Sequence, residues 1–297
     1  MNKKISGVYA VVVTPFNKDG SFNIEAAKKH LDWLIDNGIK GICLLGATGE
    51  YQNVSNSEHK QYIQEIVPYI RDRVSVIAGA TRERTEDVID LVNNLKACDA
   101  EAAMILPPFY CHPTQDEIFE HYKHINDVCD FPIIVYNNPG SAGVTIEQDT
   151  FSKLYDLKNV AAVKDSTEDI RNQTNLILNA PEHWSILCGC DNMALESFAS
   201  GSHGWISVAA NFAPRDCVDL FDSIVNKKDL KRGLEIYKRL LPALNLLETF
   251  GKPQAIIKYV LNEFRGIPVG YVRRPRMDLT PEEKTIIKEK IHIEQIS

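Results

Sequence analysis

The sequence predicts an α/β fold: a closed (β/α)8 barrel, or TIM barrel, followed by a C-terminal helical extension. Eight short apolar runs recur along the chain and are hydrophobic throughout rather than alternating, which is typical of parallel strands buried on both faces. Successive runs begin 19 to 34 residues apart, which leaves room for one crossover helix between neighbours. An open, doubly wound sheet is the alternative, but no GxGxxG fingerprint follows the first run.

The expected strands and helix starts follow from these runs and from the segments between them. Amphipathic segments separate the runs, and Asn23 precedes the first of them as a candidate N-cap. The eight expected strands are residues 8–13, 41–46, 75–80, 102–106, 132–136, 160–164, 185–189 and 204–208. Capping-box patterns mark three further helix starts: Ser55 with Glu58, Thr114 with Glu117, and Thr145 with Gln148.

The C-terminal quarter lacks a strand signal. We expect residues 1–226 to form the barrel and residues 227–297 to form a three-helix extension that packs on it without independent function. Pro242 is expected to kink or interrupt the first helix, and Thr280 to begin the last one. One face of the first helix is expected to carry Leu230, Leu234, Tyr237 and Leu241.

Composition excludes several classes of protein. The chain has 297 residues with a net charge of −7, which argues against a nucleic-acid partner, since such binding requires clustered cations. The seven cysteines are an odd number and fit a reducing cytoplasm better than a disulfide framework. Cys188 and Cys190 lack the spacing of a zinc or redox site, and His121 with His124 is interpreted as a surface pair rather than a metal site.

The N-terminal segment imitates a secretory signal. Lys3 and Lys4 precede an apolar stretch, but this stretch is short, Gly7 interrupts it, and Thr14-Pro15 follows in place of a small-residue cleavage site. A buried strand is the better interpretation. No apolar run approaches the roughly 18 residues that span a bilayer, so we expect a cytoplasmic protein without a membrane partner.

Reactive residues fall at the ends of the expected strands, where a barrel of this kind has its active site. Glycines in residues 46–50 suit either a carboxylate-binding turn or a simple tight turn. Tyr136 ends the fifth strand and Lys164 ends the sixth, so the two side chains are expected to approach each other. Burial would lower the pKa of the lysine amine and make it a nucleophile for a ketone, with the phenol moving protons. Alternatively, Lys164 extends outward to solvent and Tyr136 only packs.

Four motifs in their order along the chain resemble the dihydrodipicolinate synthase / N-acetylneuraminate lyase family. These motifs are GATGE at residues 46–50, YNNP at residues 136–139, the lysine that ends the sixth strand, and GWISVAAN at residues 204–211. The resemblance implies a class I lyase that acts on 2-oxo acids without a metal or cofactor. It also implies a homotetramer built as a dimer of dimers.

The resemblance assigns roles to individual residues. Lys164 would form the Schiff base with the keto carbon, and Tyr136 would carry protons. Thr48 would hydrogen-bond this tyrosine, and Tyr110 would act as a relay across a subunit contact. The amides of Ala47 and Thr48 would hold the substrate carboxylate, and Gly46, Gly49, Gly189 and Ile206 would be further substrate-binding residues. Ser166, Asp191 and Ser207 are candidates for the distal pocket, although each equally suits a helix cap or a strand-end hydroxyl.

Two departures from the synthase pattern bear on the substrate. Ala47 stands where those synthases have the first threonine of GTTGE, and Ser141 stands where they have an arginine for the aldehyde carboxylate. Losing that charge-assisted contact costs roughly 1.5–3 kcal/mol, which argues against ordinary synthase activity. Feedback by lysine is not expected either, because Tyr51, Gln52 and Asn56 depart from the regulatory pocket.

Three segments, YNNPGSAG at residues 136–143, VKDST at residues 163–167 and GCDNMALE at residues 189–196, resemble the branch that contains Δ1-pyrroline-4-hydroxy-2-carboxylate deaminases. This resemblance makes that cyclic imine the first substrate hypothesis. The alternatives are 4-hydroxy-tetrahydrodipicolinate synthase, an aldolase for N-acetylneuraminate or 2-keto-3-deoxy sugar acids, and a non-catalytic barrel that binds a 2-oxo acid. A barrel enzyme for phosphorylated sugars is disfavoured, because the seventh and eighth strands lack a glycine-rich phosphate loop.

Overall fold

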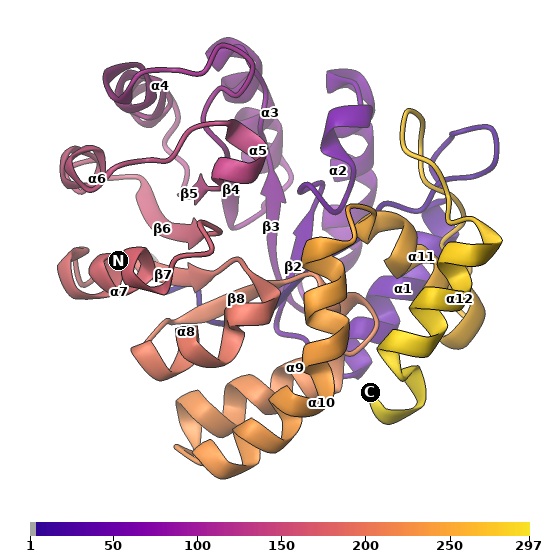
Figure 1. Ribbon diagram of the computed structural model, residues 1–297. Helices are drawn as coiled ribbons and strands as arrows, with labels where there is room; N and C mark the ends of the chain where they lie inside the picture. The colour runs from indigo at the N-terminus through magenta and orange to yellow at the C-terminus, as the bar shows by residue number, and fades with distance from the viewer. Residues whose placement is uncertain (1–3) are drawn as a thin grey trace.

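The computed structural model describes residues 4–297, so Lys3 and the two residues before it lie outside the described part. Eight parallel strands close into a barrel in sequential order, which confirms the predicted fold (Figure 1). The strands are β1 (Gly7–Val11), β2 (Gly41–Leu44), β3 (Ser75–Gly79), β4 (Ala102–Ile105), β5 (Ile133–Asn137), β6 (Val160–Asp165), β7 (Ser185–Cys188) and β8 (Gly204–Ser207).

Each strand is buried on both faces, which explains why the runs are hydrophobic throughout. Side chains such as Val11, Ile77 and Leu187 point inward and fill the centre of the barrel. Their neighbours in the chain, such as Val76 and Ile186, point outward and pack against the surrounding helices. Alternate residues of one strand therefore belong to two different apolar layers.

Helices surround the barrel and follow the strands in turn (Figure 1). Side-chain caps start several of them: Asn23 caps the first, and capping boxes at Ser55 and Thr114 are both complete, as predicted. The helices of the barrel are α1 (Ile24–Asp36), α2 (Asn56–Ile70), α3 (Thr85–Ala97), α4 (Gln115–Val128), α5 (Pro139–Ala142), α6 (Gln148–Leu154), α7 (Ile170–Asn179), α8 (Ala194–Ser200) and α9 (Pro214–Phe221).

The predicted capping box at Thr145 is wrong. The N-cap of α6 is Glu147, and its side chain makes no capping bond. Gln115 on α4 acts instead, because its Oε1 accepts from the Glu147 amide at 3.0 Å and from the Thr150 hydroxyl at 2.7 Å. A contact between helices thus replaces a local cap.

Three helices follow the barrel: α10 (Leu230–Thr249), α11 (Pro253–Phe264) and α12 (Pro281–Ile291), which Thr280 begins with a capping box. Pro242 does not interrupt α10. It lies on the exposed side, where water can bond the carbonyl that the missing N–H leaves free. The predicted face of α10 is also wrong in part, because Leu230 is 54% exposed while Ile236, Leu240 and Leu244 are buried.

No helix within residues 4–297 combines the length and hydrophobicity needed to cross a bilayer. All seven cysteines are free thiols.

Candidate active site

Tyr136 and Lys164 lie side by side at the carboxyl ends of β5 and β6. They are partners in the strand register, and the lysine Nζ lies 4.2 Å from the centroid of the phenol ring. Lys164 is only 4% exposed and Tyr136 only 6% exposed. Lys164 therefore does not extend outward to solvent.

The pKa of Lys164 departs from expectation. Burial lowers the pKa of the amine, but the electrostatic effects of Tyr136, Cys43 and Asp191 raise it, and the net shift is upward. The predicted lowering is wrong because burial brought acidic groups to the amine as well as removing water. Nucleophilic attack by Lys164 therefore requires that its proton first passes to another group.

The hydroxyl of Tyr136 accepts a hydrogen bond from Asn138 Nδ2 at 2.7 Å. No hydrogen bond between Thr48 and Tyr136 forms in the described structure, although Thr48 is buried near the same strand ends. Tyr51, which the sequence indicated only as a departure from a regulatory pocket, lines one pocket together with Tyr136 and Ser141. Burial raises the pKa of Tyr51 to about 12, and the nearby phenol of Tyr136 acts in the same direction.

The turn after β2 is tightly packed. Gly46 and Ala47 line the pocket that contains Tyr136. A Cβ on Gly46 would lie 2.8 Å from Val11 Cγ2, and a Cβ on Gly49 would lie 2.9 Å from the Cα of Leu45. These positions require glycine, because neighbouring protein atoms already occupy the space that a side chain would need.

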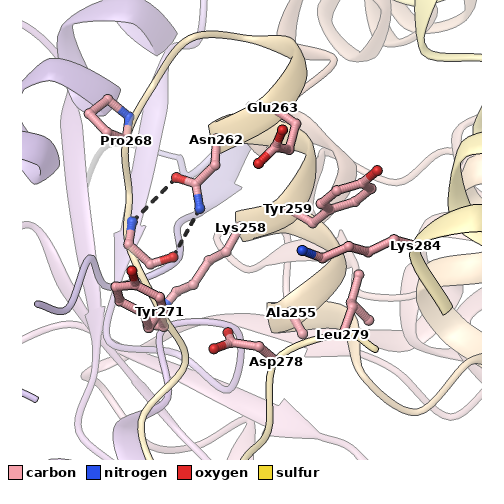
Figure 2. A pocket seen from close by; sticks show the side chains of 11 residues that line it. Ala255, Lys258, Tyr259, Asn262, Glu263, Pro268, Tyr271, Asp278, Leu279 and Lys284 are labelled. Atoms are coloured by element: carbon pink, nitrogen blue, oxygen red, sulfur yellow. Dashed lines mark hydrogen bonds between the residues drawn. The ribbon is translucent and has the colours of Figure 1, made fainter. Parts of the chain in front are cut away.

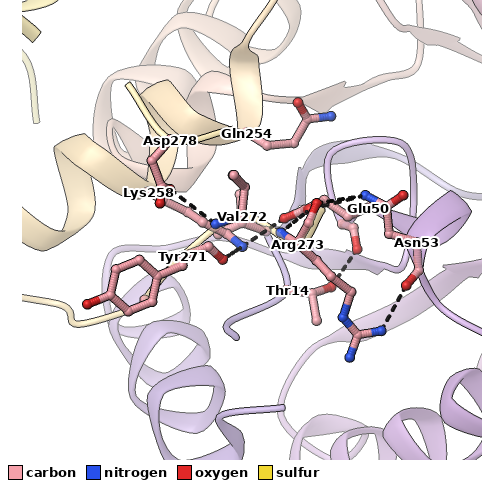
Figure 3. Close-up of polar contacts among 12 residues, drawn as sticks. Thr14, Glu50, Asn53, Gln254, Lys258, Tyr271, Val272, Arg273 and Asp278 are labelled. Atoms are coloured by element: carbon pink, nitrogen blue, oxygen red, sulfur yellow. Dashed lines mark hydrogen bonds and ion pairs between the residues drawn. The ribbon is translucent and has the colours of Figure 1, made fainter. Parts of the chain in front are cut away.

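The C-terminal extension holds this turn from outside (Figure 3). Glu50, at the end of the turn, has a φ of 58° and is fully buried. Its carboxylate accepts from Lys258 Nζ at 2.8 Å and from the Arg273 amide at 2.9 Å. Gln254 Nε2 donates to the Ala47 carbonyl at 3.0 Å. The extension therefore packs on the barrel at the turn that follows β2.

Lys258 was missed by the sequence analysis although a signal was present. It lies inside the apolar segment Ala255-Ile256-Ile257-Lys258, as Lys164 ends an apolar run. In general, a lysine inside an apolar segment indicates an amine that is buried and paired. The sequence alone does not distinguish the structural pair from the reactive one.

Tyr110 points away from the barrel of its own chain. It lies in the loop between β4 and α4 and is 85% exposed. The carboxylate of Glu83 accepts hydrogen bonds from the amides of Phe109, Tyr110 and Cys111, which holds this part of the loop in place. Within one chain, the structure does not bring Tyr110 to Lys164.

Asp191 and Ser207 bond to each other on the β7–β8 side of the mouth. Asp191 is fully buried, and its carboxylate accepts from Trp205 Nε1 at 2.9 Å, the Ala209 amide at 2.6 Å, the Val208 amide at 3.1 Å and the Ser207 hydroxyl at 3.3 Å. Four protein donors therefore saturate this carboxylate, and it ties the end of β8 to the end of β7.

Gly189 and Ser166 lie beside Lys164. Ile206 belongs to the apolar layer inside the barrel. A Cβ on Gly189 would lie 2.9 Å from Lys164 Cε and 2.1 Å from the Ser166 hydroxyl. The Ser166 hydroxyl is buried and has no partner within residues 4–297. Glycine at position 189 thus lets the side chains of Lys164 and Ser166 pack directly against its backbone.

Glu248, in the last turn of α10, was not predicted as a site residue. Its Oε1 accepts from the amide of Asp191 at 2.7 Å, which brings a half-buried carboxyl to the segment after β7. Burial and the charge of Asp191 raise the pKa of Glu248 to about 7, while Lys164 lowers it. Nothing in the local sequence of α10 indicates this contact.

The histidines do not form a metal site in the described part of the chain, where no group of three or more potential ligands gathers. The interpretation of His121 as a surface residue is wrong. It is buried on α4, its Nδ1 lies 2.9 Å from the Thr85 hydroxyl, and burial lowers its pKa to about 4. His59 is also buried, with Nε2 2.7 Å from the carbonyl of Gly79.

A separate hollow of about 440 Å³ lies within the extension, between α11 and the segment that leads to α12 (Figure 2). Asn262 forms one side and exchanges two hydrogen bonds with the backbone of Gly270. Lys258 lines the hollow, but its ammonium already pairs with Glu50. The hollow contains neither Lys164 nor Tyr136, so the candidate site is the mouth of the barrel.

Comparisons with known proteins cover nearly the whole chain. Residues 4–294 match the sequence model of the dihydrodipicolinate synthetase family. The 4-hydroxy-tetrahydrodipicolinate synthase of Afipia carboxidovorans is 34% identical over 288 residues, which cover 97% of this chain and 96% of that protein.

Solved structures are similar over the same length. The chloride-inhibited dihydrodipicolinate synthase of Acinetobacter baumannii, in complex with pyruvate, has a TM-score of 0.90 at 30% identity, with coverage of 98% of this chain and 99% of that one. A monomeric dihydrodipicolinate synthase variant has a TM-score of 0.91 at 26% identity, with coverage of 99% and 98%.

Proposed function

The chain belongs to the dihydrodipicolinate synthetase family and is a lyase, and we propose that Lys164 forms a Schiff base with a 2-oxo acid. The observation that carries the proposal is the buried contact between Lys164 and Tyr136 at adjacent strand ends. A buried amine beside a phenol is the arrangement that covalent catalysis with proton transfer requires. The imine itself withdraws electrons, so the proposed chemistry needs neither a metal nor a cofactor.

The first step is attack of the Lys164 amine on the keto carbon. Because the pKa of Lys164 is raised, the ammonium must lose its proton before attack, and Tyr136 is the adjacent group that can exchange it. Protonation of the carbinolamine hydroxyl through the same phenol then allows water to leave and the imine to form. The hydrogen bond from Asn138 orients the phenol for both transfers.

The substrate carboxylate is proposed to bind the amides of Ala47 and Thr48. Support comes from Gly46 and Ala47, which line a pocket with Tyr136, and from the extension, which fixes this turn through Glu50. A rigid turn presents its amides to the ligand without an ordering cost at binding. Across the barrel, β2 stands opposite β6, so a ligand can bridge the turn and Lys164.

The substrate proposed first is Δ1-pyrroline-4-hydroxy-2-carboxylate. Transfer of its imine carbon from the ring nitrogen to Lys164 opens the ring and frees a primary amine. Loss of the 4-hydroxyl as water, then hydrolysis of the two imines, consumes one water overall and releases ammonia and 2,5-dioxopentanoate. Ser141 supports this choice, because it provides no cation for a second carboxylate where it lines the pocket.

The second candidate is 4-hydroxy-tetrahydrodipicolinate synthase, which condenses pyruvate with aspartate semialdehyde. The name of the Afipia relative favours it. An aldolase acting on N-acetylneuraminate or 2-keto-3-deoxy sugar acids would use the same Lys164 chemistry with a different distal pocket.

A homotetramer completes the proposal. The exposed Tyr110, on a loop that Glu83 holds, would reach the mouth of a neighbouring copy as a proton relay. The similarity to a monomeric synthase variant makes the oligomeric state a question for sedimentation analysis.

Incubation with pyruvate and borohydride, followed by intact-mass measurement and peptide mapping, tests the Schiff base. We expect a covalent adduct on Lys164 that is absent from Lys164→Ala, and an adduct of full yield in that variant would refute the assignment. A panel of hydroxypyrroline carboxylate, sialic acid, 2-keto-3-deoxy sugar acids, and pyruvate with aspartate semialdehyde then identifies the substrate. Turnover of only the last pair would establish the second candidate.

A further inference from the structure

Glu248 brings an acidic group from α10 to the mouth of the barrel, in the last turn of a helix that packs against residues 191–193, which follow β7. Figure 1 shows the place of α10 beside the barrel. We propose that Glu248 is a specificity-determining residue whose carboxylate receives an ammonium or hydroxyl group at the far end of the bound 2-oxo acid. The proposal rests on the proposed function, since Lys164 and the turn after β2 set the orientation of the ligand.

The hydrogen bonds of Glu248 leave one oxygen available. Oε1 accepts from the Asp191 amide at 2.7 Å, while Oε2 has no partner among residues 4–297. The side chain is half-buried rather than enclosed, and no Lys or Arg of the described chain forms an ion pair with it. The free oxygen can therefore accept a donor from a ligand.

The residues around Glu248 are less suited than Glu248 to accept a hydrogen bond from the far end of the ligand. The Asp191 carboxylate is already saturated by four donors of the protein itself. The Ser166 hydroxyl has no partner and lies against Gly189, two positions before Asp191, so it adds a second polar group to the same side of the mouth. Glu168 contributes a further negative charge to Glu248. This side of the mouth therefore favours a ligand whose far end carries a hydrogen-bond donor or a cation, and disfavours a ligand with a second carboxylate there.

The ligand geometry agrees with this assignment. With its carboxylate on the turn after β2 and its second carbon on Lys164 of β6, the rest of the ligand extends toward the strands beside β6. Glu248 contacts the segment after β7, the neighbour of β6 in the barrel. In the proposed ring opening, the freed amine is at the fifth carbon, and a carboxylate there would bind it as an ammonium.

The test measures adduct formation at Lys164 with 2-oxo acids that differ only at the far end. The probes are pyruvate, 5-hydroxy-2-oxopentanoate, 2-oxoglutarate, and 5-amino-2-oxopentanoate supplied as its cyclic imine. We expect the wild type to reach half-maximal trapping at a lower concentration of 5-amino-2-oxopentanoate, the amino probe, than of 2-oxoglutarate, the carboxylate probe. Glu248→Gln should reduce this preference about tenfold or more, since a charge-assisted bond becomes a neutral one. An unchanged preference would overturn the proposal.

Controls separate specificity from folding. Glutamine still accepts from the Asp191 amide, so the contact with the segment after β7 is kept, and the trapping of pyruvate by each protein is the reference against which its preference is calculated. Glu235→Gln, on an exposed position of the same helix, should retain the full preference. Binding of the same probes, measured by calorimetry, distinguishes the Schiff-base proposal from the Glu248 proposal. If binding shows a preference that depends on Glu248 but no probe is trapped, the Schiff base is refuted and the specificity role of Glu248 is supported.

Acid should weaken the preference. Glu248 faces Asp191, Lys164, Glu168 and the thiol of Cys190, and its pKa of about 7 means that it gains a proton between pH 8 and pH 6. We expect the preference for the amino probe to fall across this range in the wild type and to stay flat in Glu248→Gln. Parallel pH profiles in both proteins would contradict the assignment.

Discussion

Tyr136 and Lys164 are register partners across β5 and β6, and the lysine Nζ lies 4.2 Å from the centroid of the phenol ring. This relationship makes the phenol the adjacent group through which the buried amine can exchange a proton. Substitution of Tyr136 and of Lys164, one at a time, therefore tests the catalytic proposal.

Removal of the phenol hydroxyl should slow imine formation while Lys164 remains in place. In Tyr136→Phe we expect the rate of pyruvate trapping to fall by about 10²–10⁴, the usual contribution of a positioned acid or base. Quenched time courses with borohydride measure this rate. Tyr259→Phe, on α11, should match the wild type, and equal rates in all three proteins would exclude a proton-transfer role for Tyr136.

A relay lent between subunits predicts complementation. Tyr110→Phe and Lys164→Ala should each be poorly active alone, the first because the relay is lost and the second because the nucleophile is lost. Mixing them under conditions that allow subunit exchange should restore part of the activity, since some sites then combine an intact Lys164 with an intact Tyr110 from the neighbour. Absence of recovery in verified mixed oligomers would contradict the relay.

A cation at position 141 should change the preferred ligand. Ser141 lines the pocket with Tyr136, so Ser141→Arg would place a guanidinium near the bound ligand. We expect the half-saturating concentration of 2-oxoglutarate to fall about tenfold or more, as a charge-assisted contact provides roughly 1.5–3 kcal/mol. Ser141→Gln serves as the neutral control, and an equal effect of both variants would rule out charge recognition.

The buried pair of Glu50 and Lys258 should be important for stability. The Glu50 side chain is 0% exposed and the Lys258 side chain is 2% exposed, and Lys258 Nζ lies 2.8 Å from Glu50 Oε1. Lys258→Met therefore leaves a buried carboxylate without its ion-pair partner. We expect a loss of about 3–5 kcal/mol in the free energy of unfolding, measured in urea. The double variant Glu50→Gln with Lys258→Met should lose less than Lys258→Met alone, and a fully additive loss would show that the pair is not coupled.

Buried histidines predict acid destabilisation. His30, His59 and His121 each have a pKa that burial lowers to about 4. Between pH 6.5 and 4 the unfolded chain binds these protons and the folded chain does not, so stability is full above pH 6.5 and is lost as pH falls. Asp165 and Glu248, whose pKa values burial raises to about 6 and about 7, act in the opposite direction.

Replacing one histidine isolates its contribution. His121→Gln should reduce the drop in unfolding free energy between pH 6.5 and pH 5 by about 2 kcal/mol, since each pH unit contributes about 1.4 kcal/mol per group. Urea unfolding of both proteins at the two pH values measures it. An identical drop in the variant would mean that His121 does not titrate as its burial implies.

The sequence by itself determined the barrel and the positions of its strand ends. Continuous apolar runs are local patterns, because a strand buried on both faces has no polar alternate positions, as in β3 and β7. Complete capping boxes at Ser55 and Thr114 are local as well. The adjacency of Tyr136 and Lys164 followed from these elements, since consecutive strands of a barrel are neighbours.

Only the tertiary structure decided the contacts between elements distant in the chain. Gln115 replaced the cap at Thr145, Lys258 paired with Glu50 208 residues away, and Glu248 met the amide of Asp191 57 residues away. The raised pKa of Lys164 has the same origin, because acidic groups on other strands oppose the effect of burial. Such contacts depend on how helices and strands pack, and packing energies are summed over the whole fold, so no periodicity within a single segment records them.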